Sequence, residues 1–279
     1  MEPTIQYIEK ELSGFYPVSE IRGFIRLIFE HVCGMNYTEQ ILRRSEELDP
    51  GSIKEIEKIV ERLKKHEPVQ YILSETEFLG LKLKVAPGVL IPRPETEELV
   101  QWIIDSTNHG SPSILDIGTG SGCIALALKN EMKNSRISAV DFSAKALEIA
   151  GENVRLNQLD VCFINADILN WKKYEWDNYD IIVSNPPYVR ELEKEAMFAN
   201  VLDYEPGEAL FVSNNDPLIF YREIGEFAQS YLGKNGELYF EINENLGRET
   251  EKLMSDFNFR DVVLKKDLHG KERMLRCRK

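Results

Sequence analysis

The segment Gly118–Gly122 limits the possible folds of this chain more than any other stretch. It follows the short apolar strand pattern Ile114–Ile117 and precedes the helical pattern Ile124–Leu128. Glycine is needed where a backbone turns sharply and lies close to a ligand, because a Cβ would obstruct both. The segment predicts a strand–loop–helix unit with a ligand-binding loop, and a tight turn without a ligand is the alternative. The candidate binding residues are Gly118, Thr119, Gly120, Ser121 and Gly122.

The spacing of these glycines separates two kinds of nucleotide loop. A dinucleotide fingerprint would need a further glycine at position 123, where Cys123 stands. The alternating spacing instead resembles the loop of Rossmann-like methyltransferases, which bind a nucleoside without a pyrophosphate. About 20 residues further on, the next strand pattern ends at Asp141, where a carboxylate can accept hydrogen bonds from both ribose hydroxyls. Asp167 and Ile168 follow the third strand pattern, in a stretch that methyltransferases often place beside the adenine; for Asp167, a strand-end cap is the alternative.

Strand and helix patterns alternate from Ser113 onward, which predicts a parallel sheet with covering helices. Residues 1 to about 70 show apolar residues at helical spacing and predict a small helical bundle. Between them, residues 77–94 change to a strand pattern, and Pro87–Gly88 predicts the turn of a hairpin. The predicted strands of the sheet are 114–117, 136–140, 161–165, 179–183, 236–242, 261–265 and 274–278.

The segment Asn185-Pro186-Pro187-Tyr188 follows the apolar strand pattern that ends at Val183. Two consecutive prolines fix φ and supply no backbone N–H, so the chain forms a stiff shelf. An N–H2 group offers two donors, which the Asn185 side-chain oxygen and the Pro186 carbonyl can accept. Tyr188 offers a flat face on which a planar group can stack. The alternative is a rigid turn without a ligand.

This arrangement suits methyl transfer to a planar nitrogen. An amide nitrogen is a poor nucleophile, because its lone pair is delocalised, and no side chain can deprotonate it first. Direct in-line attack on a sulfonium methyl is the plausible route, with the two acceptors orienting the nitrogen and stabilising the charge that develops on it. In a doubly wound sheet the fourth strand lies beside the first, so we expect Asn185 next to Gly118 at the switch point where ligands bind.

Charge and composition exclude other classes of function. A formal net charge of −13 opposes broad binding to nucleic acid. The four cysteines show no CxxC spacing, so neither a zinc site nor a disulfide framework is expected, and a reducing cytoplasm fits them best. We see no signal peptide and no apolar run of transmembrane length. No role is assigned to the dispersed histidines His31, His66, His109 and His269.

A longer resemblance narrows the substrate. The stretches 67–73 (EPVQYIL) and 89–97 (VLIPRPETE), together with Tyr204-Glu205-Pro206, are similar to those of the bacterial peptide chain release factor glutamine methyltransferases. The resemblance covers residue 67 to the C-terminus, while residues 1–66 match only in helical character. Three positions depart from the family pattern: Ser74, Asn243 and Leu246.

This resemblance implies an α/β fold: a Rossmann-like class I methyltransferase sheet with a small N-terminal helical bundle, joined by a β-hairpin linker. The implied domains are residues 1–73 (substrate recognition), 74–94 (linker) and 95–279 (methyl transfer). It implies S-adenosyl-L-methionine as cofactor, held by the loop Gly118–Gly122, Asp141, Asp167–Ile168 and Asn185.

The same resemblance implies release factors as substrates, with Asn185, Pro186, Pro187 and Tyr188 holding the glutamine of a Gly-Gly-Gln motif. Arg93 would brace the substrate peptide, and a solvated arginine is the alternative. A cytoplasmic monomer without direct nucleic-acid contact is expected. An amino-methyltransferase acting on adenine in DNA or RNA, and a non-catalytic binding module, stay open as alternatives.

Overall fold

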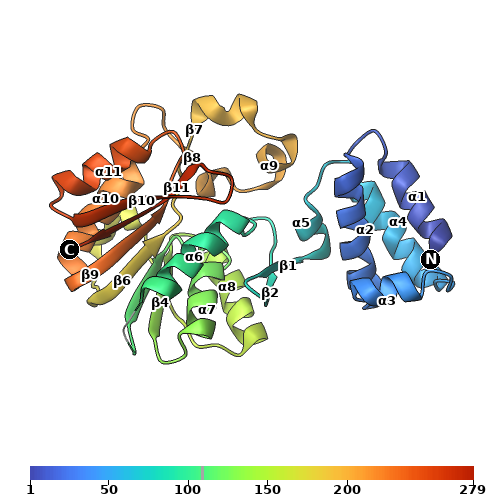
Figure 1. Cartoon of the computed structure of the whole chain (residues 1–279), viewed down its shortest axis with the longest axis horizontal. Helices are drawn as coiled ribbons and strands as arrows, with labels where there is room; N and C mark the ends of the chain where they lie inside the picture. Colours follow the sequence, from blue (N-terminus) through green and yellow to red (C-terminus); the bar gives the residue numbers. More distant parts are fainter. Residues whose placement is uncertain (108–109) are drawn as a thin grey trace. The chain divides into compact units, whose positions relative to one another are not determined.

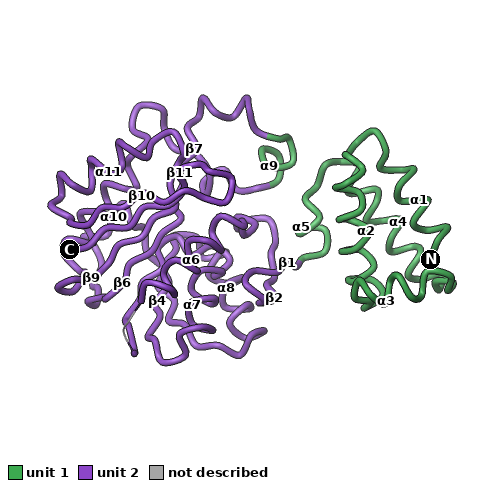
Figure 2. Tube along the Cα trace, viewed as in Figure 1, with its two compact units in different colours: residues 1–74, 198–204 green, residues 75–197, 205–279 purple. Residues whose placement is uncertain are grey.

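The computed structural model describes residues 1–107 and 110–279 and divides them into two compact units. The helical unit comprises residues 1–74 and 198–204, and the sheet unit comprises residues 75–197 and 205–279 (Figure 2).

The helical unit packs amphipathic helices around one apolar core, as the sequence predicts. Ile21, Phe24 and Ile28 recur at helical spacing on α2, and all three are buried. Asp49 caps α4, where its side chain accepts the backbone N–H groups of Gly51 and Ser52. The helices of this unit are α1 (Glu2–Leu12), α2 (Val18–Cys33), α3 (Tyr37–Leu42), α4 (Pro50–Leu63), α5 (Val69–Leu73) and α9 (Ala199–Tyr204).

Helix α9 enters this unit from a distant part of the sequence. The Tyr204 hydroxyl donates a hydrogen bond to the Lys65 carbonyl at 2.9 Å. The sequence analysis assigned residues 198–204 to the sheet domain, because nothing in a six-residue helix shows which core it joins.

The hairpin exists, but its turn lies earlier than the sequence analysis placed it. Strands β1 (Glu75–Phe78) and β2 (Leu81–Lys84) pair antiparallel around Leu79 and Gly80, which both have positive φ. Positive φ at both central residues suits the right-handed twist of a two-residue hairpin. Pro87–Gly88 also turns the chain, but residues 89–91 form no strand, so the predicted hairpin turn there was wrong.

The sheet has the order β10-β11-β9-β6-β3-β4-β5 (Figure 1). Neighbours pair in parallel except around β11, which is antiparallel to both β9 and β10. The predicted parallel sheet is therefore confirmed, with one strand reversed. Its strands are β3 (Ser113–Ile117), β4 (Arg136–Asp141), β5 (Cys162–Asn165), β6 (Tyr179–Ser184), β9 (Leu232–Glu241), β10 (Arg260–Lys266) and β11 (Glu272–Arg278).

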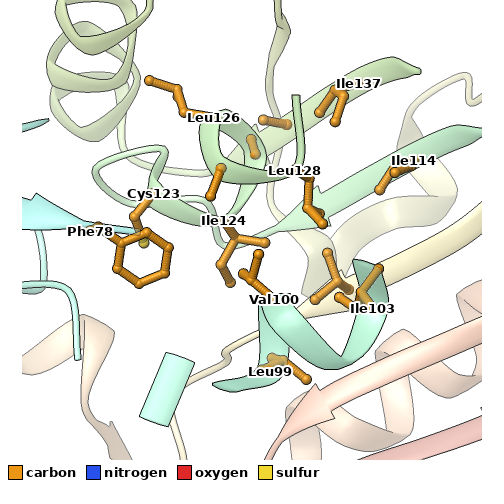
Figure 3. Packing of buried hydrophobic residues seen from close by; sticks show 14 of the residues in the cluster. Phe78, Leu99, Val100, Ile103, Ile114, Cys123, Ile124, Leu126, Leu128 and Ile137 are labelled. Atoms are coloured by element: carbon orange, nitrogen blue, oxygen red, sulfur yellow. The ribbon is translucent and has the colours of Figure 1, made fainter. Parts of the chain in front are cut away.

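Helices cover both faces of this sheet, and the central strands are accordingly buried on both sides. Along β6, Ile181 and Val183 belong to one core while Ile182, between them, belongs to the other. Figure 3 shows the first core, where Val100 of α6 and Ile124 of α7 pack together. The helices of the sheet unit are α6 (Pro94–Ser106), α7 (Cys123–Glu131), α8 (Ala144–Asn157), α10 (Ile219–Tyr231) and α11 (Gly247–Asp256).

Shorter elements complete the sheet unit. Strands β7 (Val189–Arg190) and β8 (Phe211–Val212) pair in parallel. The 3-10 helices are η1 (Ile168–Lys173), η2 (Glu191–Ala196) and η3 (Gly207–Ala209).

Candidate active site

The carboxyl ends of β3 and β6 lie side by side and place the two main motifs together. Ile117 of β3 is in register with Ser184 of β6, so Gly118 and Asn185 follow paired residues. The predicted position at the switch point is confirmed. A cavity of about 340 Å³ opens there, a size within the range of small-ligand sites. Its lining includes Gly118, Gly120, Asp141, Asp167, Ile168, Asn185, Pro186 and Pro187.

The glycine loop contributes to the cavity through two of its three glycines. Gly118, Gly120 and Gly122 all have positive φ, at +73°, +56° and +84°. A Cβ on Gly118 or Gly120 would meet no protein atom within 4 Å. On Gly122 it would lie 2.7 Å from Leu126 Cδ1 and 3.2 Å from Ala150 Cβ. The first two glycines keep space beside the cavity, and the third allows the loop to pack against α7 and α8.

The hydroxyl side chains of the loop turn inward and do not line the cavity. Thr119 is buried, and its hydroxyl donates a hydrogen bond of 2.6 Å to Asp116 Oδ2. Ser121 is also buried. Burial raises the pKa of Asp116 to about 7. Thr119 therefore stabilises the loop from beneath, whereas the buried Ser121 hydroxyl has no hydrogen-bond partner among the described residues.

Asp141 is held rigidly at the edge of the cavity. Its Oδ2 accepts the backbone N–H of Gly120 and its Oδ1 accepts that of Ser143, both at 2.9 Å. Burial raises the pKa of Asp141, while these hydrogen bonds oppose the rise. Each carboxylate oxygen keeps a second lone pair, which suits a diol such as a ribose.

Asp167 caps a helix, as the alternative in the sequence analysis expects, and it also lines the cavity. Its Oδ1 accepts the N–H of Leu169 at 2.9 Å and caps η1, and the residue also lines the cavity together with Ile168. The cap fixes the direction of the chain along the cavity wall.

The Asn185 amide is the start of a hydrogen-bond relay that crosses three elements of the sheet unit. Asn185 Nδ2 donates to Thr96 Oγ1 at 3.2 Å, and the Thr96 hydroxyl donates to Glu241 Oε2 at 2.6 Å. The other oxygen of Glu241 accepts the Tyr188 hydroxyl at 2.8 Å. Tyr188 is directed toward Glu241 and is not among the residues that line the cavity. We call Asn185, Thr96, Glu241 and Tyr188 the relay.

Comparison with known proteins gives the family. The family model described as the PrmC N-terminal domain matches residues 5–73, and the one described as the methyltransferase small domain matches residues 96–216. The release factor glutamine methyltransferase of Flavobacterium psychrophilum is 46% identical, over 95% of this chain and 94% of its own length. The chain belongs to the release factor glutamine methyltransferase family.

A second relative agrees with this family, and a solved structure shares the fold. The release factor glutamine methyltransferase of Bacteroides thetaiotaomicron is 43% identical, over 96% of both chains. The Thermus thermophilus 16S rRNA N2 G1207 methyltransferase, solved with AdoMet and guanosine, shares the fold at a TM-score of 0.53 and 18% identity. It covers 74% of this chain and 49% of its own chain.

The comparisons also correct the expected extent of the family resemblance. The sequence analysis limited it to residues 67 onward, whereas the N-terminal model matches from residue 5. Many different apolar residues satisfy the spacing of an amphipathic helix. Inspection of one sequence therefore identifies the helical character of residues 5–66 but not their family.

Two residues of the family-like motifs outside the cavity bind each other. Arg93 Nη2 contacts Glu205 Oε1 at 2.6 Å, and Glu205 Oε2 accepts the backbone N–H of Ile91 at 3.1 Å. Glu205 is buried, so the ion pair connects the segment before α6 to the segment that continues with Pro206 on the cavity wall. The structure thus gives Arg93 an internal partner in this member of the family.

The described part of the chain contains neither a candidate metal cluster nor a candidate membrane-spanning helix. Within residues 1–107 and 110–279, no group of three or more His, Cys, Asp or Glu side chains is arranged to hold a metal ion. No described helix combines the length and the apolar character needed to span a bilayer. His109 lies outside the described residues.

Several residues at the site had no signal in the sequence analysis. In the sequence analysis, Thr96 belongs only to the family-like stretch 89–97, and Glu241 belongs only to the predicted strand 236–242. The register of β9 with β6 pairs Phe240 with Ser184, so Glu241 follows beside Asn185. Strand order would have been needed to find this neighbour.

Proposed function

We propose that this enzyme transfers the methyl group of S-adenosyl-L-methionine to the side-chain amide nitrogen of the glutamine in the Gly-Gly-Gln motif of release factors. The observation that carries the proposal is the pair of free acceptors beside the cavity. Within the described residues, neither the Asn185 side-chain oxygen nor the Pro186 carbonyl accepts a hydrogen bond. An amide N–H2 group supplies the two donors that this pair requires.

The cavity suits the proposed cofactor. The space beside Gly118 and Gly120 admits a nucleoside, and Asp141 presents carboxylate lone pairs to its ribose. Asp167 and Ile168 form a further part of the wall, which supports the proposal that the adenine lies beside them. When bound, the cofactor supplies an electrophilic methyl group on a sulfonium.

The protein residues act by orientation and by charge stabilisation. The Asn185 oxygen and the Pro186 carbonyl hold the two N–H groups of the amide and direct its nitrogen toward the cavity. Positive charge develops on this nitrogen in the transition state, and the two acceptors stabilise it there more than in the ground state. The proton leaves late, so no strong base is required.

We further propose the division of labour implied by the family. Residues 1–73 recognise the release factor, residues 74–94 form the linker, and residues 95–279 carry out methyl transfer. The protein acts as a monomer in the cytoplasm, where release factors work, and without direct contact with nucleic acid. The relatives that match nearly the full chain are named for release factors, which supports this choice of substrate.

Labelled cofactor and purified release factor test the proposal. We expect label on the release factor, mass spectrometry to place it on the Gly-Gly-Gln glutamine, and none on a release factor with that glutamine changed to alanine. Asn185→Ala should lower the rate strongly while leaving the fold intact. Undiminished transfer to the alanine substrate would refute the proposed target. Label on DNA or tRNA and not on release factor would favour the adenine alternative.

A further inference from the structure

The Asn185 side chain has two orientations that differ only in the exchange of its oxygen and its N–H2 group. One orientation presents an acceptor toward the cavity, and the other presents a donor. The two differ little in shape, so packing alone cannot choose between them. Hydrogen-bond partners must make the choice.

Thr96 can make this choice only if its own proton is committed elsewhere. A threonine hydroxyl has one proton and can also accept. The Thr96 hydroxyl donates its hydrogen bond to Glu241 Oε2, at a distance of 2.6 Å. Thr96 Oγ1 then faces Asn185 as an acceptor, and the N–H2 group must point toward it, at 3.2 Å.

Both carboxylate oxygens of Glu241 act as hydrogen-bond acceptors in the relay. The residue is 1% exposed, and its two oxygens each receive a hydroxyl, from Thr96 and from Tyr188. Burial raises the pKa of Glu241, whereas the hydrogen bonds from Thr96 and Tyr188 and the charge of Arg273 oppose the rise. With both hydroxyl protons directed at it, the carboxylate needs no proton of its own.

We propose that Thr96 and Glu241 are positioning residues that hold the Asn185 oxygen toward the substrate and thereby restrict the site to groups that donate two hydrogens. This inference rests on the proposed function and names the source of its selectivity. A primary amide satisfies the acceptor pair of Asn185 and Pro186. A carboxylate has no proton to donate and is repelled by two oxygens, so a glutamate at the same position is rejected.

Thr96→Val tests the relay, since valine keeps the shape and removes the hydroxyl. We expect kcat to fall tenfold or more, the size associated with the loss of an oriented hydrogen bond, while KM and the cofactor affinity change less than twofold. Thr96→Ser should restore most of kcat. Glu241→Gln should resemble Thr96→Val, because an amide at 241 can donate to Thr96 and release its proton toward Asn185.

Thr250→Val is the matched control. Thr250 is fully buried in the same unit, and its hydroxyl donates to the Leu246 carbonyl at 2.8 Å, outside the relay. This variant loses a buried hydroxyl as well, so it should alter stability and leave kcat unchanged. An equal fall of kcat in Thr250→Val and Thr96→Val would assign the effect to general destabilisation and overturn the inference.

A spectroscopic measurement separates this inference from the proposed function. In asparagine-labelled protein, the Asn185 side-chain N–H2 protons should give a nuclear Overhauser contact to Thr96, and Glu241→Gln should abolish it. An unchanged contact in that variant, or an unchanged kcat in Thr96→Val, would refute the relay. If the parent protein labels no release factor, the proposed function fails and the Overhauser contact alone decides the inference.

Discussion

The three glycines of the loop should respond differently to the same substitution. Gly122 is enclosed, because a Cβ there would meet Leu126 and Ala150, which are both fully buried. Gly120 lies beside the cavity, and its Cβ would meet open space. We therefore predict that Gly122→Ala damages the fold and that Gly120→Ala damages cofactor binding.

The expected magnitudes follow from the geometry. Alanine at the φ of +84° found at Gly122 costs about 1–2 kcal/mol, and the contact of 2.7 Å with Leu126 adds about 1–3 kcal/mol of overpacking. The lower entropy of the unfolded chain offsets about 0.4–1 kcal/mol of this cost, so the net loss is about 1–4.6 kcal/mol. Gly120→Ala keeps the backbone cost without the clash, and its net loss is at most about 1.6 kcal/mol.

Urea unfolding, monitored by tryptophan fluorescence, measures the difference in unfolding free energy between the two variants in the sheet unit, which contains the glycine loop. All three tryptophans, Trp102, Trp171 and Trp176, belong to the sheet unit. Titration calorimetry with the cofactor gives the affinity, which should fall more than tenfold in Gly120→Ala. A Gly122→Ala variant as stable as the parent, or a Gly120→Ala variant with parental affinity, would refute the division of the loop into packing and binding glycines.

Three further changes test single residues. Asp141→Ala should weaken cofactor binding in calorimetry, because the lone pairs offered to the ribose are lost; an unchanged affinity would remove Asp141 from the binding site. Asp116→Asn should flatten the pH dependence of stability. The folded pKa of Asp116, about 7, lies above its unfolded value, so the parent loses stability as pH rises from about 4 to 7, by about 4 kcal/mol at most. Urea midpoints across this range measure the loss, and equal slopes for both proteins would contradict it. Ser74→Gly should stabilise the helical unit by about 0.5–1 kcal/mol in thermal unfolding, since Ser74 ends α5 with a φ of +58°; a lower midpoint would show that the Ser74 side chain has a compensating role.

The sequence was most informative where structure is decided locally. The predicted strand 136–140 corresponds to β4 at Arg136–Asp141, and the predicted helical stretch 124–128 lies within α7 at Cys123–Glu131. The spacing of apolar residues, a glycine loop and a proline pair each determine the conformation of only a few neighbouring residues. A single sequence is therefore enough to recognise them. The hairpin turn was misplaced because Pro87–Gly88 is the stronger turn signal, while the hairpin itself turns at Leu79 and Gly80.

The relay could not be predicted because its members are far apart in the chain. Thr96 and Glu241 are separated by 145 positions, and they meet because α6, which carries Thr96, packs against β9, which ends at Glu241. Neither residue is unusual locally: a threonine in the first turn of a helix and a glutamate at the end of a strand are ordinary. Their chemistry arises from burial and from partners that the fold supplies.

The Asn-Pro-Pro-Tyr segment therefore depends on more of the chain than its four residues indicate. The prolines fix the backbone of the shelf, but they leave the orientation of the Asn185 amide open. That orientation decides whether the site accepts a donor or an acceptor, and it is set by Glu241 through Thr96. Tyr188 holds the second oxygen of the same carboxylate, so one end of the motif stabilises the group that orients the other end. A segment that carries the acceptor residues yet lacks a buried carboxylate at the end of β9 would keep the shape of this site and lose its preference for an amide nitrogen.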